Sequence, residues 1–479
     1  MGFYLGVDVG TSSTKAVLLD ERGAIIQKSS VKNELINPRP GFFEVDALSS
    51  WWEGFLSILR EFQPYTAKVS RLCISSVCGS FVPVDENLDP TYHAILYGID
   101  TRSVDQIERM NRALGEEYLQ KHFAGAFTTQ SVLPKILWLK ENEEAVYERT
   151  KYFVESNNFI TARLTGSTCW DASTAFAAKL ADLESEEIPY SILDSFGIER
   201  EKIPGLKWAV DELGCVTAEA SRLTGLPENA IVHVGACDVN AEAMSMLSIF
   251  PGDTMAVLGS TLSMLHMMDH YIPLDGFVCG FSVMKGTYRF GVGASSGGLF
   301  LHTLDEHFGF EGKPAPMKEC PTGLLILPYI NGARTPFNDP FAKCTIWGID
   351  GKSERSDYFW AIREAIGYEM FLLDSKMEET GERIETIHLS GGVAQDEEIV
   401  QLISDITGKQ LVVHRGTNAA YGDALIALHG EYSWDGIRAL EGFMELEGET
   451  RTITPDETRS GLYRPLRAKF LKLYEAQRL

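Results

Sequence analysis

The sequence predicts an α/β protein made of two similar halves. Strand-like and helix-like stretches alternate along most of the chain, which is typical of layered α/β folds. A strand, a Gly/Ser/Thr turn and a second strand occur at residues 4–20, and the same order returns at residues 254–267. With 479 residues the chain is also long for a single hydrophobic core. We therefore expect two domains, residues 1–246 and 247–479, with a cleft between them.

The opening hairpin is the most informative element. Residues 4–20 read YLGVDVGTSSTKAVLLD, with a turn at residues 10–13. Backbone N–H groups and hydroxyls of such a turn can contact a phosphate, because no bulky Cβ is in the way. Asp8, at the end of the first strand, is placed to hold Mg²⁺ through its water shell. An ordinary hairpin with a capping Asp is the alternative, and the spacing fits neither a Walker loop nor a dinucleotide fingerprint.

Hydrophobic periodicity predicts the remaining elements in order. In the first half it favours strands at 4–9, 14–20, 24–31, 69–76, 81–85, 95–97 and 231–234, and helices at 46–62, 103–121, 134–149 and 239–248. Pro134 suits the first turn of its helix. In the second half it favours strands at 254–258 and 262–267, a strand ending at Ser390, and a helix at 395–407 that Gly408 ends.

Composition and charge narrow the functional classes. Apolar residues make up 44% and charged residues 23% of the chain, and no apolar run is long enough to cross a bilayer. The net charge of −24 argues against nucleic acid or an anionic membrane as a partner, since both require a basic surface. The chain enters its first strand without a basic leader, so we expect a cytoplasmic protein. The eight cysteines contain no C-x-x-C pair, which indicates neither a zinc site nor a disulfide framework.

A candidate catalytic carboxylate follows the strand at 231–234. Asp238 ends the segment Gly235-Ala236-Cys237-Asp238, which leads into a helix. In α/β folds, ligands bind at the carboxyl ends of strands, and a carboxylate there can accept a proton from a substrate hydroxyl. A helix N-cap is the alternative role, and the two roles are compatible.

Two glycine-rich loops in the second half also allow a close approach to the backbone. Gly391 and Gly392 follow a strand and precede a helix, where a flat ring or a phosphate can reach the main chain. A plain strand–turn–helix connection would have the same composition. The loop Gly291–Gly298 (GVGASSGG) has the wrong glycine spacing for a dinucleotide fingerprint.

Together these segments resemble the FGGY family of carbohydrate kinases, which contains xylulokinase, ribulokinase and glycerol kinase. The resemblance covers nearly the whole chain and keeps the family's order of motifs. The matching stretches are GVDVGTSSTKAVLLD (6–20), GFFEVDALSSWW (41–52), LYGIDTRS (96–103), GACDVNA (235–241), VLGSTLS (257–263), NGARTPFNDPFAKCTIWGI (331–349), SGGVAQDEEIVQLISDITG (390–408) and YGDALIA (421–427).

The resemblance implies two actin-like (ribonuclease H-like) ATPase domains, ATP and Mg²⁺ as cofactors, and phosphoryl transfer to a small sugar or polyol. It implies a ketopentose such as xylulose or ribulose as the acceptor, and a homodimer as the assembly. Asp238 takes the general-base position and Asp8 the metal position. The substrate-binding positions fall on Cys78, Gly79, Asp100, Arg102 and Asp238. The ATP-binding positions fall on Gly10, Thr11, Ser12, Lys15, Gly259, Ser260, Gly297, Gly391, Gly392 and Gln395.

Some of these residues have simpler explanations when taken alone, and the sugar pocket departs from the xylulokinase pattern. The pair Asp100 and Arg102 also fits a surface turn, and Lys15 a solvated strand residue. Xylulokinases usually carry Gln-x-His-Gly where this chain has residues 76–79 as SVCG, and a Trp where it has Gly98. These changes remove a hydrogen bond and a stacking face. Kinases for glycerol, erythritol or gluconate, a sugar-independent actin-like ATPase and a non-catalytic binding protein remain alternatives.

Overall fold

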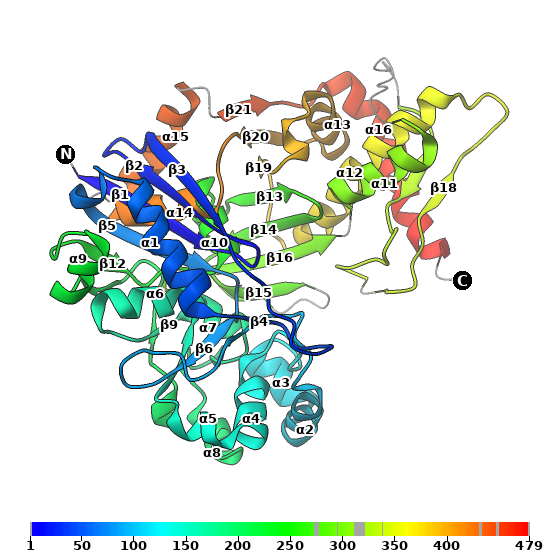
Figure 1. The fold of residues 1–479 in the computed structure, drawn as a ribbon. Coiled ribbons are helices and arrows are strands. Elements are labelled where there is room, and N and C mark those ends of the chain that lie inside the picture. Colours follow the sequence, from blue (N-terminus) through cyan, green and yellow to red (C-terminus); the bar gives the residue numbers. More distant parts are fainter. Residues whose placement is uncertain are drawn as a thin grey trace. The chain divides into compact units, whose positions relative to one another are not determined.

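The chain folds into two compact units. The computed structural model describes residues 2–272, 277–294, 296–310, 321–337, 339–430, 434–446 and 450–477. Unit 1 contains Met1–Leu247, Gly280–Gly286 and Thr417–Glu441. Unit 2 contains Ser248–Cys279, Thr287–Gly416 and Gly442–Leu479. In each unit, helices pack on a central β-sheet (Figure 1).

Unit 1 is built on a six-stranded mixed sheet with the strand order β11-β12-β5-β1-β2-β3. Its strands are β1 (Phe3–Val9), β2 (Ser13–Leu19), β3 (Ile25–Lys32), β5 (Val69–Ser76), β11 (Glu212–Cys215) and β12 (Ile231–His233). Strand β1 runs antiparallel to β2 and parallel to β5. Leu5, Val7 and Val9 are buried in the core, and strand alternation turns Gly6 and Asp8 to the opposite face of the sheet.

Helix α14 (Ala419–His429) packs on β1, β5 and α10 (Asp238–Ser245), although it lies far along the chain (Figure 1). The packing is close enough to require glycine. A Cβ on Gly6 would lie 2.0 Å from the backbone O of Ala420, which no side chain tolerates. A segment near the end of the chain therefore completes unit 1.

A buried carboxylate attaches α14 to the end of β5. Asp423 of α14 is fully buried, and its Oδ2 accepts hydrogen bonds from the backbone N of Ser75 at 3.1 Å and from Ser75 Oγ at 2.6 Å. Burial raises the pKa of Asp423 well above its usual range. Ser75 is the residue of β5 that pairs with Asp8 of β1. The contact of Asp423 is therefore made to the direct neighbour of the predicted metal-binding residue.

The rest of unit 1 contains smaller sheets and several helices. A four-stranded sheet has the order β4-β7-β6-β8 and a two-stranded sheet pairs β10 with β9. These strands are β4 (Glu44–Val45), β6 (Phe81–Val84), β7 (Ala94–Ile95), β8 (Tyr152–Glu155), β9 (Trp170–Asp171) and β10 (Leu206–Lys207). The helices, besides α10 and α14, are α1 (Glu53–Glu61), α2 (Val104–Leu114), α3 (Glu116–Phe123), α4 (Val132–Asn142), α5 (Glu144–Arg149), α6 (Ser156–Thr165), α7 (Ala172–Ala177), α8 (Tyr190–Ser195) and α9 (Ala218–Thr224).

Three predicted helices of unit 1 are interrupted. The helix expected at 103–121 is two helices, because Gly115 adopts φ 79° between α2 and α3. The helix expected at 134–149 is divided at Glu143, which has φ −131°. The helix expected at 46–62 begins with a π-helical turn at Ala47–Trp52, and Asp46 caps that turn. Periodicity identified the helical segments but not the breaks inside them.

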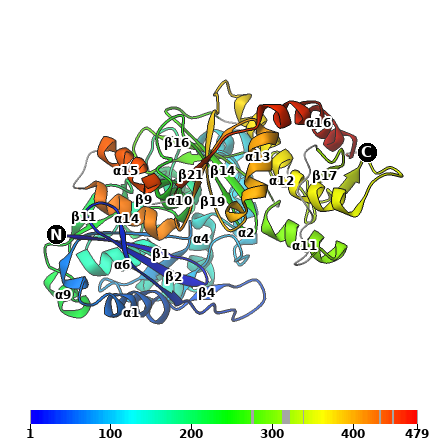
Figure 2. The same ribbon diagram turned by 90° about the horizontal axis from the view of Figure 1, so that it is seen from above.

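Unit 2 is built on a seven-stranded sheet with the order β15-β16-β14-β13-β19-β20-β21. Its strands are β13 (Thr254–Leu258), β14 (Leu262–Met268), β15 (Val278–Phe281), β16 (Tyr288–Ala294), β19 (Thr386–Ser390), β20 (Gln410–His414) and β21 (Thr450–Ile453). A separate pair is formed by β17 (Leu325–Leu327) and β18 (Thr345–Trp347). The helices are α11 (Gly298–Phe308), α12 (Arg355–Glu378), α13 (Glu397–Thr407) and α16 (Glu457–Gln477), while α15 (Trp434–Leu446) spans the boundary between the units. Helices α12, α13 and α16 pack against one another (Figure 2).

The core of unit 2 contains a carboxyl group that makes stability depend on pH. Glu369 of α12 is 1% exposed and accepts a hydrogen bond from the Tyr329 hydroxyl at 3.3 Å. Burial raises its pKa to about 8. Since the folded state binds this proton more tightly than the unfolded state, the stabilising contribution is complete below pH 4 to 5 and is lost as the pH rises toward 8.

Replacement of Glu369 by Gln should remove this pH dependence while keeping an acceptor for the Tyr329 hydroxyl. We expect Glu369→Gln to be more stable than the wild type by on the order of 3 kcal/mol at pH 8 and by little at pH 4.5. Thermal unfolding at both pH values measures the difference. Glu385→Gln, at an exposed position, is the control. A wild type and a Glu369→Gln variant with parallel pH profiles would contradict the assignment.

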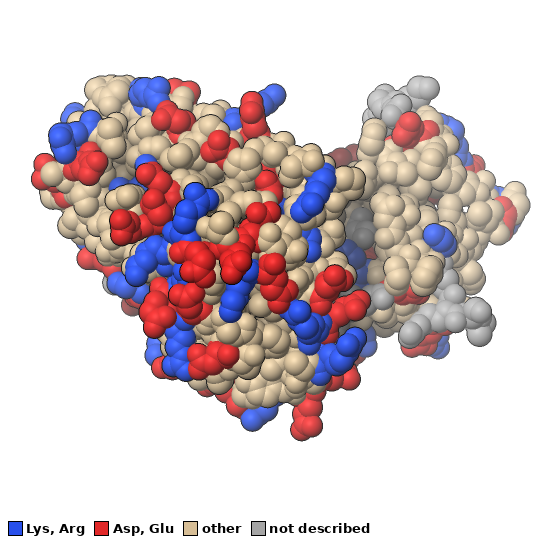
Figure 3. Space-filling view, turned by 60° about the horizontal axis from the view of Figure 1, so that its bottom comes forward, with Lys and Arg blue, Asp and Glu red and all other residues tan. Residues whose placement is uncertain are grey.

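The described surface mixes charges of both signs. On the face seen in Figure 3, Lys and Arg side chains lie among Asp and Glu side chains, without a continuous basic area. None of the helices in the described part of the chain combines the length and the hydropathy that a bilayer crossing needs.

Candidate active site

Asp8 occupies the end of β1 in an environment that suits a cation. The residue is 8% exposed, and within the described part of the chain its Oδ1 has no hydrogen-bond partner. The pKa of Asp8 is raised to about 7, because burial and, to a smaller extent, the charge of Asp238 raise it more than the charge of Lys15 lowers it. A buried carboxylate oxygen without a donor is costly unless a positive charge or water reaches it.

The turn between β1 and β2 is held rigid by Asn33. The Nδ2 of Asn33 donates to the backbone O of Gly10 at 2.7 Å, and its Oδ1 accepts from Thr14 Oγ1 at 3.1 Å. The backbone N of Asn33 donates to the O of Ser12 at 3.0 Å. Thr11 and Ser12 are exposed at the tip. The turn therefore presents polar groups to solvent from a fixed backbone, and Asn33 is a residue that sequence patterns did not indicate.

Asp238 begins α10, immediately after the turn that follows β12. Gly235 in this turn adopts φ 91°, a conformation that favours glycine. The backbone N of Ser76, at the end of β5, donates to the O of Ala236 at 3.2 Å. Cys237 occupies the N-cap position, and Asp238 Oδ1 accepts from the N of Val239 at 2.8 Å. The N-cap role that the sequence allowed for Asp238 is therefore wrong, because Asp238 is the first residue inside the helix and its carboxylate bonds the backbone N of the next residue.

A third carboxylate, Glu242, lies on the same face of α10 as Asp238. The two residues are four positions apart, which places them one turn apart on the helix. The pKa of Glu242 is raised to about 7, because burial and then the charges of Asp238 and Asp8 raise it more than Lys15 lowers it. Helical spacing from Asp238 was a signal for Glu242 that sequence reasoning did not use.

These carboxylates fit a hydrated cation better than a directly bound one. The charge of Asp238 raises the pKa of Asp8, the charges of Asp238 and Asp8 raise the pKa of Glu242, and Lys15 lowers both pKa values. No set of three or more Asp, Glu, His or Cys side chains among the described residues is arranged to ligate a metal ion directly. Mg²⁺ keeps several of its waters in most protein sites, so the donor set is compatible with it.

The predicted sugar loop is tightly packed. Gly79 adopts φ 73°, and a Cβ there would lie 3.0 to 3.1 Å from Tyr97, Ala178 and the backbone O of Gln130. Cys78 beside it is 8% exposed. A larger side chain is therefore excluded at position 79, where the backbone packs directly against its neighbours.

Gly98, where xylulokinases usually carry Trp, also has a positive φ. Its φ is 72°, and its backbone N donates to the O of Thr129 at 3.2 Å. Large side chains rarely adopt this conformation. The local backbone conformation therefore favours glycine over tryptophan at position 98.

Asp100 and Arg102 form a fully buried ion pair. Their side chains are 0% exposed, and Arg102 Nη2 lies 2.8 Å from Asp100 Oδ2 and 2.9 Å from Glu44 Oε1. Asp100 Oδ2 also accepts from the backbone N of Phe43 at 2.8 Å. The pair is thus not a surface turn, and in this structure its polar atoms are covered by protein. A direct contact with sugar stays a prediction for both residues.

A buried lysine supports the same segment. Lys135 of α4 is 0% exposed, and its Nζ donates to the backbone O of Leu96 at 2.7 Å. Its pKa is lowered to about 7, because burial and the charge of Arg102 lower it more than the charge of Asp100 raises it. The stretch that carries Asp100 is therefore anchored from both ends by buried polar groups.

In unit 2, three of the predicted ATP-binding segments lie together. The backbone N of Gly298 donates to the O of Gly259 at 2.7 Å, and that of Leu299 to the O of Ser260 at 3.1 Å. A Cβ on Gly297 would lie 2.7 Å from the O of Ser260. The start of α11 thus packs directly on the turn between β13 and β14.

Gly391 and Gly392 meet the same turn from β19. Strand β19 runs parallel to β13, so their carboxyl ends are neighbours. Gly391 adopts φ 103°, and a Cβ there would lie 2.4 Å from the O of Leu258, whereas Gly392 has open space around it. Gln395 is exposed, and its Nε2 lies 3.4 Å from the O of Gly391. Ser295 of the loop 291–298 and Asn338 of the motif 331–349 lie outside the described residues.

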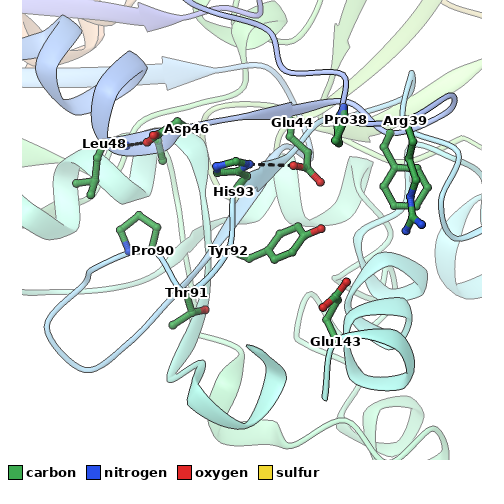
Figure 4. Close-up of a pocket in the computed structure, with 12 residues that line it drawn as sticks. Pro38, Arg39, Glu44, Asp46, Leu48, Pro90, Thr91, Tyr92, His93 and Glu143 are labelled. Carbon is green, nitrogen blue, oxygen red and sulfur yellow. Dashed lines mark hydrogen bonds and ion pairs between the residues drawn. The ribbon is translucent and has the colours of Figure 1, made fainter. Parts of the chain in front are cut away.

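Unit 1 also contains a cavity of about 680 Å³ that none of the predicted site residues lines. Figure 4 shows its side chains, which come from two loops, strand β4, the start of the π-helical turn and the C-cap of α4. Glu44 is 3% exposed, and its Oε2 lies 3.0 Å from His93 Nδ1. Since Glu44 also binds Arg102, the Asp100–Arg102 pair is connected to this cavity through Glu44.

The sequence and the structure of this chain are similar to those of known carbohydrate kinases. Residues 3–245 match the model of the FGGY family of carbohydrate kinases, N-terminal domain, and residues 311–431 match that of the C-terminal domain. The chain is 30% identical to a xylulose kinase of Lactococcus lactis over 92% of this chain and 90% of that protein, and 26% identical to one of Bacillus subtilis over 90% and 88%. The crystal structure of a xylulose kinase from Rhodospirillum rubrum superposes with a TM-score of 0.87 at 23% identity, covering 99% of this chain and 98% of that one.

The chain therefore belongs to the FGGY family of carbohydrate kinases. It is a phosphotransferase with an alcohol group as acceptor, and kinases of this family use ATP. The predicted fold class, two actin-like domains of the α/β type, is confirmed.

Proposed function

We propose that this protein transfers the γ-phosphoryl group of ATP to a hydroxyl of a ketopentose, with xylulose as the first candidate. The relatives named above are xylulose kinases, and the chain aligns with them over most of its length. The observation that carries the chemistry is the position of Asp238, a half-buried carboxylate at a strand–helix junction beside Asp8.

In the proposed reaction Asp238 accepts the proton of the acceptor hydroxyl. As the O–H bond breaks, the oxygen forms a bond to the γ-phosphorus, and the bond from that phosphorus to the bridging oxygen breaks to release ADP. The backbone at Cys78 and Gly79 would orient the acceptor. Asp100 and Arg102 would hold the backbone of the segment 96–103 in place, since Arg102 is paired with Asp100 and with Glu44.

The charge of the nucleotide would be balanced by groups on the chain and by Mg²⁺. Asp8 would hold the hydrated ion, which neutralises developing negative charge on the phosphates. In unit 1, Gly10, Thr11, Ser12 and Lys15 would donate to phosphate oxygens. In unit 2, we assign Gly259, Ser260 and Gly297 to phosphate and Gly391, Gly392 and Gln395 to adenosine. Positioning and electrostatics supply most of the rate in this chemistry.

A coupled assay of ADP release over a panel of acceptors tests the function. The panel contains xylulose, ribulose, glycerol, erythritol and gluconate, with a reaction lacking any acceptor as the control. We expect turnover that requires a ketopentose and is highest with xylulose. Highest turnover with another acceptor would reassign the substrate, since one hydroxyl or methylene can decide between related sugars.

Two other outcomes would reject the proposal. ADP release that does not depend on any acceptor would identify a sugar-independent ATPase. Absence of turnover, with nucleotide binding retained in calorimetry, would identify a binding protein that has kept the fold. Neither outcome would alter the family assignment.

A further inference from the structure

Asn157 joins two strands whose ends lead to predicted site residues. It is the second residue of α6 and is fully buried. Its Nδ2 donates to the backbone O of Ile74 at 3.2 Å and to that of Val234 at 3.4 Å. Its Oδ1 accepts from Ser76 Oγ at 3.3 Å, and its backbone N donates to the same Oγ at 3.2 Å. One side chain thus contacts the end of β5 and the turn that follows β12.

The contacts lie in a gap in the pairing between these segments, before the parallel bridge of Ser76 and Cys237. The ladder of β5 and β12 pairs Leu72 with Val232 as its last pair. Asn157 binds the carbonyl groups two residues further along each strand, those of Ile74 and Val234. Buried carbonyl groups need a hydrogen-bond donor. The Asn157 amide supplies it to these two carbonyl groups in place of a backbone N–H of the neighbouring strand.

Glycine in the turn makes this bridge possible. A Cβ on Gly235 would lie 1.9 Å from the O of Ile74 and 2.9 Å from Asn157 Nδ2. The bare backbone of the turn therefore packs against β5 within reach of the amide. Cys78 follows Ser76, the last residue of β5 that Asn157 contacts, by two positions. Asp238 follows Gly235 by three positions.

We propose that Asn157 is a positioning residue, which fixes the turn before Asp238 relative to the loop that carries Cys78 and Gly79. It sets the distance between the general base and the bound acceptor without touching either reactant. This inference rests on the proposed function, because the distance matters only if Asp238 accepts the acceptor's proton. Misplacement of a reacting group by about 1 Å can cost on the order of 100-fold in rate.

The adjacent residue offers a matched control. Asn158 is also fully buried in α6, and its Oδ1 accepts from the backbone N of Cys169 at 2.8 Å, away from the two strand ends. We expect Asn157→Ala and Asn158→Ala to lose similar stability. We expect only Asn157→Ala to lower kcat, about 10- to 100-fold, with KM for the acceptor changing less than about threefold.

A second readout does not depend on activity. Hydrogen exchange, followed by mass spectrometry, should accelerate at least tenfold in peptides spanning 74–79 and 232–240 for Asn157→Ala but not for Asn158→Ala. Equal kcat losses in the two variants, or unchanged exchange in Asn157→Ala, would overturn the positioning role. A wild type inactive on every acceptor would reject the proposed function instead, while exchange still decides whether Asn157 holds the turn.

Ser76→Ala keeps the test decisive if Asn157→Ala does not fold. This variant removes only the Ser76 Oγ, which bonds both to the side chain and to the backbone of Asn157. We expect a smaller fall in kcat, about 3- to 10-fold, and faster exchange in the same two peptides. A Ser76→Ala variant with wild-type kcat and exchange would overturn the proposal.

Discussion

Replacement of Asp238 by Asn is expected to reduce kcat by about 10² to 10⁴-fold. Asparagine keeps the shape of the side chain and an acceptor for the N of Val239, but it does not take up a proton at neutral pH. The acceptor hydroxyl then attacks the phosphorus without a base. Steady-state kinetics with saturating ATP, together with calorimetry of acceptor binding, separates this effect from a loss of affinity.

Binding and a surface control make this result specific. Acceptor affinity should change only a few-fold in Asp238→Asn, since the amide can still hydrogen-bond to a hydroxyl. Asp194→Asn, at an exposed position paired with Arg200, should retain wild-type kcat. A near-normal kcat in Asp238→Asn would remove Asp238 from the role of general base.

The second large effect is expected at Gly422, where α14 crosses α10. A Cβ on Gly422 would lie 1.7 Å from the backbone O of Ala241, and a helix backbone cannot yield as a flexible side chain does. We expect Gly422→Ala to destabilise the protein by roughly 3 kcal/mol or more, at the upper end of overpacking effects. Because α10 begins with Asp238, the displaced helix should also lower kcat.

Gly461 provides the matched comparison for this prediction. It is likewise a glycine inside a helix, α16, but a Cβ there has open space around it. Gly461→Ala should therefore stabilise its helix by about 0.5 to 1 kcal/mol. Denaturant unfolding of both variants measures the contrast. If Gly422→Ala is as stable as the wild type, the close contact between α14 and α10 is wrong.

The positions of several strands and helices could be predicted from hydrophobic periodicity and from glycines at helix ends. The strands expected at 4–9, 14–20 and 69–76 lie at Phe3–Val9, Ser13–Leu19 and Val69–Ser76. The helix expected at 395–407 is Glu397–Thr407, ended by Gly408 in a left-handed conformation. Alternation along a strand and glycine after a helix are properties of the local chain, so they can be read without knowledge of the tertiary structure.

Contacts between distant segments could not be predicted in this way. The return of residues 417–441 to unit 1 depends on two glycines that let backbones touch, those at positions 6 and 422, and Gly235 in the same way lets the turn after β12 touch β5. Nothing local distinguishes these from glycines in open turns. Asn33 and Asn157 act through side-chain amides that bind carbonyls far away in sequence. For Asp100 and Arg102, the sequence suggested either a surface turn or a sugar contact, and burial in an ion pair with Glu44 required the fold.

The order in which unit 1 is assembled has a consequence for the nascent chain. When the ribosome has made the first 247 residues, α14 does not yet exist, and the face of β1 that carries Gly6 and Asp8 lacks its cover until most of unit 2 has been synthesised. Such an incomplete unit exposes apolar surface and is prone to aggregation. A fragment that stops at residue 247 is therefore expected to be insoluble, and chaperones are expected to hold this face during translation.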